Sequence, residues 1–422
     1  MAINDPQAAA LALNERWERA LPPDLAGSAW ATVARNTAMK LLPEAPDHYQ
    51  RASLLSGAQE SEWSDETMAW KVRAALRANN GKGRWQQVVQ AVDAMSPDDQ
   101  KEAAWVYWKA RGLQSLAAGS QDAEALRQQS RRMLGSIAGH LSFYGKLAAE
   151  SLGQPFVLPP APALLAPAEK DGATTHPGLQ RALQLASLTL RDEARREWNY
   201  SLRGMSDRQL LAAAAMACAA GDWQLCINTS ERTRGEIDLS QRYPAPYRDE
   251  IVARSRELGL DPPYVLGLIR QETRFMPTLR SHAGASGLMQ VMPATAKWTA
   301  RKIGLDFTPN MINDPNVNLR IGTGYLKLVL DSFEGSQALA AAAYNAGPNR
   351  PRRWREGPWL DTAVWAENIP FTETRDYVKK VLSNATVYAA LLNGEPPVLR
   401  ARLGRQVGPR DANAPEPDSD LP

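Results

Sequence analysis

The chain has 422 residues, which at about 150 residues per domain corresponds to two or three domains. It carries 49 Lys and Arg against 46 Asp and Glu, a formal net charge of +3, and this balance excludes the strongly basic composition that is typical of nucleic-acid binders. Because no apolar run approaches the roughly 18 residues that a membrane-spanning helix needs, the sequence also excludes an integral membrane protein.

Helical periodicity dominates the first part of the chain, which is rich in Ala, Leu, Gln, Glu and Arg. Paired helices in series indicate an α-superhelical array over residues 1–155, and seven of the 13 Trp residues fall in it, where we expect them to pack helix pairs. The pattern predicts helices over Glu66–Ala78, Trp85–Ala94, Pro97–Ala117 and Ala123–His140.

Five Pro residues lie between Pro155 and Pro167, and Pro cannot continue a helix, so residues 156–175 are predicted to be a linker. Residues 176–242 return to a helical pattern, and we interpret them as a helical linker domain with tight turns at Gly204 and Gly221.

The two cysteines of the chain, Cys218 and Cys226, lie on either side of the Gly221 turn. Facing helices could bring the two sulfur atoms together, so one disulfide and a pair of small buried thiols both remain open interpretations. The four His residues are scattered without the spacing of metal ligands, so the sequence predicts no metal and no cofactor.

Residues 243–395 form the segment whose side chains indicate chemistry. Asp261 and the two prolines that follow it begin an apolar helix that is predicted to end near Glu272. A carboxylate at the negative end of a buried helix is expected to have a raised pKa, as a general acid requires. The alternative is an exposed glutamate paired with Arg270 or Arg274.

A glycine-rich loop, residues 283–292, follows and leads into a helix that Pro293 is expected to begin. Were the segment extended, Gln290 and Met292 would point to one side and face a groove, and Met289 and Val291 would face the core. The alternative is a glycine-rich turn with both methionines buried.

Three more helices are predicted: from Asp314 to about Phe333, over Ala338–Tyr344, and from Glu373 to Leu392. Tyr344 and Asn345 lie in the last turn of the second, where they could also be a core tyrosine and a capping asparagine. The tail, residues 396–422, is rich in Arg, Pro and Asp and is predicted to be disordered.

Four segments in order resemble the lytic murein transglycosylase family: QETRF (271–275), GLMQVMP (287–293), AYNAG (343–347) and ENIPFTETRDY (367–377). Each is weak alone, but four in sequence over about 110 residues are specific. The helices before them, including the patch FYGKLAAE (143–150), are similar to the superhelical and linker domains of the large soluble type, although the array is short for a full ring. The family usually has Glu-Ser where this chain has Glu-Thr.

The resemblance implies a lysozyme-like domain that cleaves the β-1,4 bond between N-acetylmuramic acid and N-acetylglucosamine in peptidoglycan and forms a 1,6-anhydro ring. Most glycosidases use two carboxylates, whereas the family's pattern supplies one, which maps to Glu272 as acid and then base. The positions that bind substrate map to Thr273, Ser286, Gln290, Met292, Tyr344, Asn345, Glu367 and Tyr377.

Several alternatives stay open at this point. Glu367 could form an ion pair with Arg375 or Lys379 instead of lining a groove. A hydrolytic, lysozyme-type muramidase would need a second carboxylate, for which Glu373 and Asp376 are the candidates. A non-catalytic peptidoglycan-binding scaffold, or a helical-repeat binder of other proteins, would use the array alone.

The expected partners follow from the same resemblance: peptidoglycan glycan strands, no nucleic acid, and proteins of cell-wall synthesis or remodelling, with the chain acting as a monomer. The first residues, MAINDPQAAA, do not form a signal peptide. A periplasmic location, which the resemblance implies, would therefore mean that an export signal has been removed.

Overall fold

The computed structural model describes residues 1–394, 396, 398–411, 413 and 420–422. Over these residues the chain is predominantly α-helical, which confirms the predicted all-α fold. Its two strands, β1 (Leu360–Asp361) and β2 (Gln406–Val407), have two residues each and pair antiparallel. Among the described helices, none combines the length and the apolar character that crossing a membrane requires.

The chain forms two compact units, and each unit is assembled from separate stretches of sequence. The first comprises residues 1–156, 332–383 and 398–421, and the second comprises 157–331, 384–397 and the last residue. These units group the residues differently from the domains expected above, whose boundaries remain predictions.

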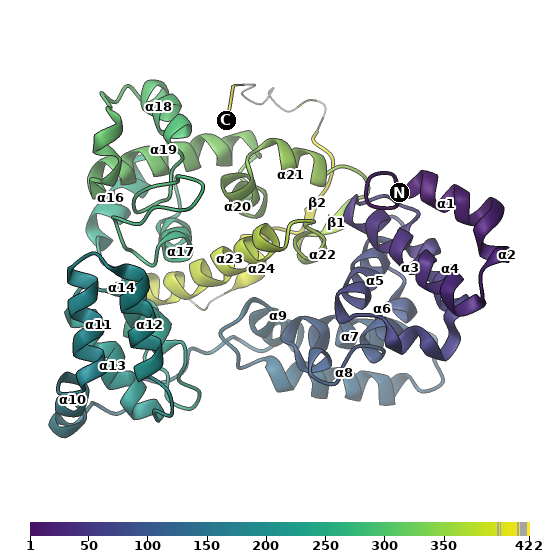
Figure 1. Cartoon of the computed structure of the whole chain (residues 1–422), viewed down its shortest axis with the longest axis horizontal. Helices are drawn as coiled ribbons and strands as arrows, with labels where there is room; N and C mark the ends of the chain where they lie inside the picture. Colours follow the sequence, from purple (N-terminus) through teal and green to yellow (C-terminus); the bar gives the residue numbers. More distant parts are fainter. Residues whose placement is uncertain (395, 397, 412, 414–419) are drawn as a thin grey trace. The chain divides into compact units, whose positions relative to one another are not determined.

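The first 156 residues form consecutive, mostly antiparallel helices in which α3 packs on α4, α5 on α6 and α7 on α8 (Figure 1). A π-helical turn (Leu13–Trp17) and two 3-10 segments (Gly57–Glu62 and Asp99–Lys101) interrupt the series. The helices are α1 (Pro6–Ala12), α2 (Glu18–Ala20), α3 (Pro23–Met39), α4 (Ala45–Ser56), α5 (Asp65–Arg77), α6 (Trp85–Asp93), α7 (Ala103–Leu116), α8 (Ala123–Ile137) and α9 (Phe143–Ser151).

Tryptophans anchor this series of helices, as the composition predicts. Trp30, Trp70, Trp105 and Trp108 are buried among alanines, whereas Trp17 is half exposed. The helix predicted from Pro97 is wrong in its first turn. The backbone of Glu102 is extended between the 3-10 segment and α7, so the α-helix starts only at Ala103.

The C-terminal part of the first unit contains several short elements and the beginning of a long helix, α23. Its elements are α20 (Gln337–Ala346), α21 (Asn349–Trp354), β1, α22 (Thr362–Glu367), the first turns of α23 (Thr372–Asn393), α24 (Leu399–Leu403) and β2.

The predicted disorder of residues 396–422 is wrong for 399–407, which form α24 and β2. Leu399 and Leu403 are buried, and β2 finds a partner strand that lies far away in sequence. Residues 412 and 414–419 of the predicted tail lie outside the described residues.

The second unit begins one residue after the start of the predicted linker, and the linker is partly helical. Residues 157–166 have no regular structure, and Pro167 then starts a helix with the Glu169 carboxylate bound to the backbone N–H of Ala166. The helices are α10 (Pro167–Thr174), α11 (Pro177–Ser187), α12 (Arg191–Ser201), α13 (Asp207–Ala219), α14 (Trp223–Ser230), α15 (Leu239–Arg242), α16 (Arg248–Glu257), α17 (Pro262–Glu272), α18 (Pro293–Lys302) and α19 (Pro315–Ser332), with a 3-10 segment at Pro309–Asn313.

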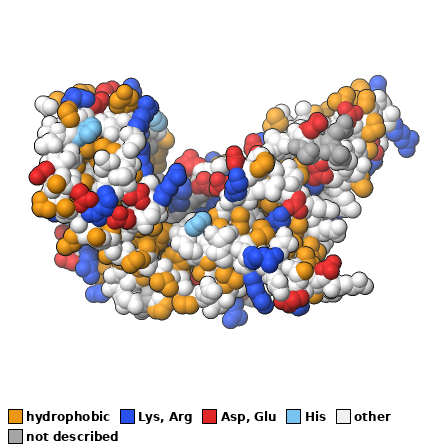
Figure 2. All heavy atoms as spheres, turned by 90° about the horizontal axis from the view of Figure 1, so that it is seen from below, with side chains coloured by type: hydrophobic (Ala, Val, Ile, Leu, Met, Phe, Trp, Pro, Cys, Tyr) orange, Lys and Arg blue, Asp and Glu red, His pale blue; other side chains and the backbone are white. Residues whose placement is uncertain are grey.

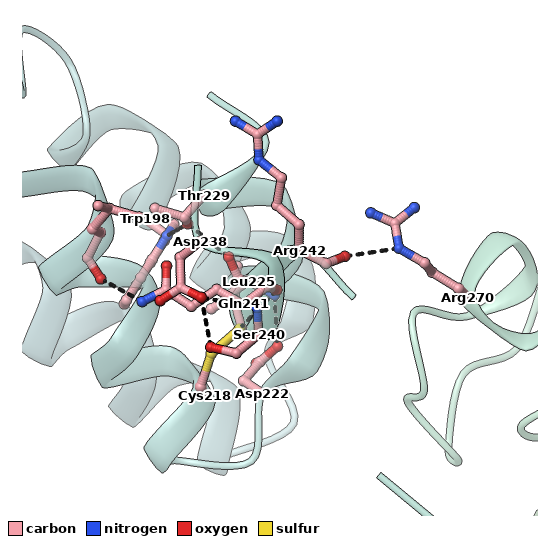
Figure 3. The surroundings of a disulfide bond; sticks show 12 residues. Trp198, Cys218, Asp222, Leu225, Thr229, Asp238, Ser240, Gln241, Arg242 and Arg270 are labelled. Atoms are coloured by element: carbon pink, nitrogen blue, oxygen red, sulfur yellow. Dashed lines mark hydrogen bonds between the residues drawn. A yellow bond between two sulfur atoms is a disulfide. The ribbon is translucent and has the colours of Figure 1, made fainter. Parts of the chain in front are cut away.

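A disulfide between Cys218 and Cys226 joins α13 to α14, which resolves the alternative left open by the sequence (Figure 3). Gly221 adopts a left-handed conformation (φ +72°) in the turn between the two helices. Beside it, the Trp198 indole donates a hydrogen bond to Thr229 Oγ1 at 2.8 Å inside a buried cluster that includes Leu179. The disulfide therefore reinforces a helical hairpin that already has its own core.

The surface shows the near balance of charges. Acidic and basic side chains are interspersed with hydrophobic ones over the face drawn in Figure 2. This agrees with the net charge of +3.

Candidate active site

Glu272 is the last residue of α17, as the sequence predicts, and its side chain is half-buried. The helix begins at Pro262, and the apolar residues before Glu272, such as Leu268 and Ile269, are fully buried. The chain then leaves the helix through Arg274 and Phe275, which both have a positive φ. Because left-handed backbone is unfavourable for residues other than Gly, this exit must be held by its surroundings.

The two arginines that flank Glu272 are bound to another carboxylate. Arg270 Nη2 lies 2.8 Å from Glu231 Oε1, and Arg274 Nη2 lies 3.4 Å from Glu231 Oε2. Arg270 also donates to the carbonyl oxygen of Arg242 at 2.8 Å (Figure 3) and to Asn384 Oδ1 at 3.1 Å. Both arginines therefore pair with Glu231, whereas the alternative considered above paired one of them with Glu272.

Burial alone would raise the pKa of Glu231, but Arg270 and Arg274 outweigh that effect and hold the pKa below its usual value. Glu231 follows directly on α14, the second helix of the disulfide-linked hairpin. The hairpin thus supports the C-terminal end of α17 through a charged contact.

The glycine-rich loop is a compact turn, so the extended conformation considered above is wrong. Ser286 and Val291 form an antiparallel bridge in which each backbone N–H donates to the other's carbonyl at 3.1 Å. Gln290, with a φ of +49°, closes the turn. Leu288 and Met289 are buried between the two bridging residues.

Asn318, which the sequence did not single out, holds this turn from α19. Its Oδ1 accepts from the Met289 N–H at 2.7 Å, and its Nδ2 donates to the Ser286 carbonyl at 3.0 Å. Gly287 is required there, because a Cβ atom would lie 2.1 Å from Asn318 Nδ2 and the φ is +79°. A lone Asn in a helix carries no sequence signal for such a role.

The predicted substrate-binding residues of this half occupy different environments. Thr273 is buried, and its hydroxyl donates to the Leu288 carbonyl at 2.8 Å, which ties the end of α17 to the turn. Ser286 is also buried, and its hydroxyl donates to the Gly284 carbonyl. Gln290 Nε2 donates to the Leu279 carbonyl at 2.9 Å. Met292 is 41% exposed and presents an apolar surface, so only one of the two methionines is in the core.

Tyr344 and Asn345 lie in the last turn of α20, in the other unit, and both are half-buried. Asn345 Oδ1 accepts a hydrogen bond from the Thr374 hydroxyl at 2.7 Å, and its Nδ2 lies 3.4 Å from Glu373 Oε1. Asn345 therefore joins the end of α20 to the first turn of α23. Tyr377, one turn further along α23, is buried.

Glu367 is the last residue of α22 and is 1% exposed. Its Oε1 accepts from Arg73 Nη2 at 2.9 Å and Nε at 3.1 Å, and its Oε2 accepts from Lys379 Nζ at 3.1 Å and from the Tyr144 hydroxyl. Arg375 Nε lies 4.0 Å away. We call these five residues the Glu367 network. The predicted direct contact of Glu367 with a sugar finds no support in this buried geometry, and the alternative ion pair with Lys379 is present.

The electrostatics of the Glu367 network follow from its burial. Burial alone would raise the pKa of Glu367, but the positive charges of Lys379, Arg73 and Arg375 outweigh it and lower the pKa to about 2. Burial and the adjacent carboxylate raise the pKa of Tyr144 well above its usual value, so its hydroxyl remains a donor. Glu367 is therefore an anion at neutral pH.

The sequence did not reveal Arg73 or Tyr144 as members of this network. Both lie more than 200 residues before Glu367, in α5 and α9. The patch FYGKLAAE (143–150), which contains Tyr144, was the available signal, but its residues alone do not say what they contact.

Comparison with known proteins shows which family models the chain resembles. Residues 250–358 match the family model described as the transglycosylase SLT domain, and residues 173–234 match the soluble lytic murein transglycosylase L domain. Residues 368–397 match the soluble lytic transglycosylase helical domain. Three separate segments of this all-α chain thus resemble domains of the soluble lytic transglycosylases.

Individual relatives agree with this resemblance. The chain is 33% identical over 324 residues to the soluble lytic murein transglycosylase of Salmonella typhimurium, over 75% of this chain and 48% of the relative. It is 29% identical over 355 residues to that of Escherichia coli K12, over 80% of this chain and 53% of the relative. The chain is thus similar to the soluble lytic murein transglycosylases, and it spans about half the length of these curated relatives.

Solved structures show the same likeness in three dimensions. The lytic transglycosylase Slt of Pseudomonas aeruginosa, solved as an inactive mutant, superposes with a TM-score of 0.80 at 31% identity, over 96% of this chain and 64% of that one. The 70-kDa soluble lytic transglycosylase of Escherichia coli gives a TM-score of 0.74 at 27% identity, over 96% and 63%. The latter type of enzyme has also been solved in complex with bulgecin A.

Proposed function

We propose that this chain is a peptidoglycan lytic transglycosylase in which Glu272 is the single general acid and base. The observation that carries the proposal is the position of Glu272. It is the half-buried last residue of α17, inside the matched SLT domain, and the arginines on either side of it are bound to Glu231. A carboxylic acid in such a place is suited to proton transfer.

In the first step, Glu272 donates its proton to the glycosidic oxygen between N-acetylmuramic acid and N-acetylglucosamine, and the bond from that oxygen to C1 breaks. The carbonyl oxygen of the N-acetyl group on the muramic acid then bonds to C1 and forms an oxazolinium-like intermediate. The substrate thereby supplies the group that a second carboxylate supplies in most glycosidases.

In the second step, the Glu272 carboxylate accepts the proton of the C6 hydroxyl of the same muramic acid. The C6 oxygen bonds to C1 and displaces the N-acetyl oxygen, which gives the 1,6-anhydro ring and returns Glu272 to its protonated form. Water is not consumed, and one residue acts first as acid and then as base.

The surrounding residues support this reaction in distinct ways. We propose that Gln290 meets a sugar through its carbonyl oxygen, because its amide nitrogen is used within the turn. The exposed Met292 would supply apolar contact. Thr273 would hold Glu272 in place through its hydrogen bond to Leu288. Tyr344 would bond to the N-acetyl group, while Asn345 and Tyr377 would hold that wall of the groove.

We further propose that the chain works in the periplasm. The support is the disulfide between Cys218 and Cys226, since such bonds persist in oxidising compartments. The substrate, peptidoglycan, lies in the same compartment.

The test is the Glu272→Gln variant, assayed for release of soluble muropeptides from purified sacculi. We expect a loss of at least about a thousandfold in rate, because the amide can neither donate the proton nor accept it. Bulgecin A, which a related enzyme binds, should still bind the variant and so report an intact groove.

The matched control is Glu257→Gln. Glu257 is also the last residue of a helix of the same unit, α16, and its exposed carboxylate pairs with Arg254. The control should digest sacculi at the wild-type rate. Wild-type digestion by the Glu272→Gln variant would show that the proposed function has the wrong residue at its centre.

A further inference from the structure

Helix α9 (Phe143–Ser151) carries buried polar side chains, and these contact the C-terminal part of the first unit. The Tyr144 hydroxyl donates to Glu367 at the end of α22. Lys146 is fully buried and donates to the Ser383 hydroxyl on α23 at 2.8 Å. Glu150 accepts the backbone N–H of Leu399, the first residue of α24, at 2.5 Å. One short helix of the array therefore contacts three successive helices, α22 to α24.

Helix α5 also contacts Glu367 at the end of α22, through Arg73. Arg73 donates through Nε and Nη2 to the Glu367 carboxylate and through Nε to the Glu367 backbone carbonyl at 3.2 Å. Its guanidinium lies over the rings of Trp70 and Trp105, at 4.9 and 5.3 Å from their centroids. The guanidinium group of Arg73 thus binds both the side chain and the backbone of Glu367 at the end of α22. The rings of Trp70 and Trp105 in turn hold this group in position.

The residues that follow Glu367 lead to Tyr377 and to the hydrogen bond that holds Asn345, two of the predicted substrate-binding residues. Asn368 to Phe371 lead into α23, where Thr374 binds Asn345 and where Tyr377 lies one turn later. Any movement at Glu367 is transmitted along this short connection, because the loop between α22 and α23 has only four residues.

We propose that Arg73 and Tyr144 are positioning residues: they hold Glu367, and through it the start of α23, so that the helical array completes the substrate-binding wall formed by Tyr344, Asn345 and Tyr377. The proposal rests on the proposed function for the identity of the substrate. It assigns to the array a direct part in binding the glycan strand, in addition to any role in holding other proteins.

Arg73 and Tyr144 can hold Glu367 in place because a buried ionic cluster that lacks one of its members is unfavourable in free energy. One carboxylate faces three cations within the Glu367 network, and each is largely removed from water. Removal of one hydrogen-bond donor leaves the remaining buried charges without full compensation. These charges can be hydrated again only if the chain around Glu367 moves away from its neighbours. The groove wall would then be populated in more than one position, which weakens substrate binding before it affects proton transfer.

The experiment compares Tyr144→Phe, Arg73→Lys and Arg73→Met in the full chain, with soluble glycan strands as substrate. Tyr144→Phe keeps the ring and removes one hydroxyl, so it is expected to fold. We expect the apparent KM to rise about tenfold for Arg73→Met and less for Arg73→Lys and Tyr144→Phe, while kcat falls by less than roughly threefold. Amide hydrogen exchange should accelerate over residues 362–383 and remain unchanged in α13 and α14.

The matched control is Glu66→Gln. Glu66 lies on α5, as Arg73 does, and its exposed carboxylate pairs with Arg35 of α3. This variant should leave KM and exchange unchanged. A purely structural role would lower the amount of active enzyme, and hence kcat, without raising KM. An unchanged KM in both Tyr144→Phe and Arg73→Lys, with exchange over 362–383 as in the wild type, would overturn the proposal. If these variants behave as wild type while Glu272→Gln is inactive, the proposed function stands and only this inference fails.

Discussion

Two glutamates, Glu272 and Glu367, each end a helix that belongs to a motif, yet their surroundings are opposite. Glu272 is half-buried at the end of α17, and its flanking arginines are bound to Glu231. Glu367 is almost completely buried at the end of α22 and accepts from two cations and a tyrosine. The comparison teaches that the same residue type at the end of a helix can be enclosed by cations as a buried anion, as Glu367 is, or stay half-buried, as Glu272 is, where we propose that it transfers protons.

The largest expected difference in stability comes from converting each glutamate to glutamine. Glu367→Gln should lower the free energy of unfolding by about 3 to 5 kcal/mol, because it leaves buried cations without their carboxylate. Glu272→Gln should lower it by less, because Glu272 is half-buried and its carboxylate remains partly in contact with water. Urea denaturation of both variants measures the contrast. Equal destabilisation by the two changes would contradict it.

The pH dependence sharpens the same contrast. The pKa of Glu367 falls from an ordinary value of 4.5 to about 2 on folding, so its contribution of about 3 kcal/mol is fully present above pH 4.5 and is lost as the pH falls toward 2. The stability difference between wild type and Glu367→Gln should therefore shrink between pH 4.5 and 2. Thermal denaturation at a series of pH values checks this, and a difference that grows on acidification would refute it.

The next effect concerns the support of Glu272. Replacing Cys218 and Cys226 together by serine should lower the free energy of unfolding by about 2 to 3 kcal/mol, because the disulfide closes a short loop in the unfolded chain. The hairpin has its own core around Trp198, so the fold should survive. Denaturation of the double variant under oxidising conditions tests this, with reduced wild type as the matching control.

The smallest expected effect lies next to Glu272. Thr273→Val removes the hydroxyl that binds the Leu288 carbonyl and should cost about 1 to 3 kcal/mol, since it leaves a buried acceptor unsatisfied. Thr273→Ser keeps the hydroxyl and should be close to neutral. Denaturation midpoints of the pair, with sacculus digestion rates, measure it. A Thr273→Ser variant as impaired as Thr273→Val would show that the methyl group matters instead of the hydrogen bond.

The local parts of the fold were predictable because their signals lie within a few residues. Asp261 and the prolines after it correctly predicted the start of α17, and the helix predicted over Ala338–Tyr344 lies within α20. The prediction of a linker over the Pro-rich segment is wrong from Pro167 onward, because Pro is favourable at the first position of a helix and Pro167 starts α10.

The remaining features depend on contacts between distant parts of the sequence. The pairing of β1 with β2 gives residues 406–407 a regular structure, although the composition of the tail is typical of disordered segments. The ion pair of Glu367 with Lys379, twelve residues away, was foreseen as an alternative, whereas Arg73 is 294 residues away and was not. At the site, Glu272 carries its own helix-end signal, but Asn318 acts only through the turn that the fold brings to it.

The central claim is that one carboxylate, Glu272, cleaves the glycan without water, and mass spectrometry of the muropeptides released from sacculi tests it most directly. We predict products that end in 1,6-anhydro-N-acetylmuramic acid from the wild type and none from Glu272→Gln. Products with reducing N-acetylmuramic acid ends would contradict the account and indicate a hydrolase.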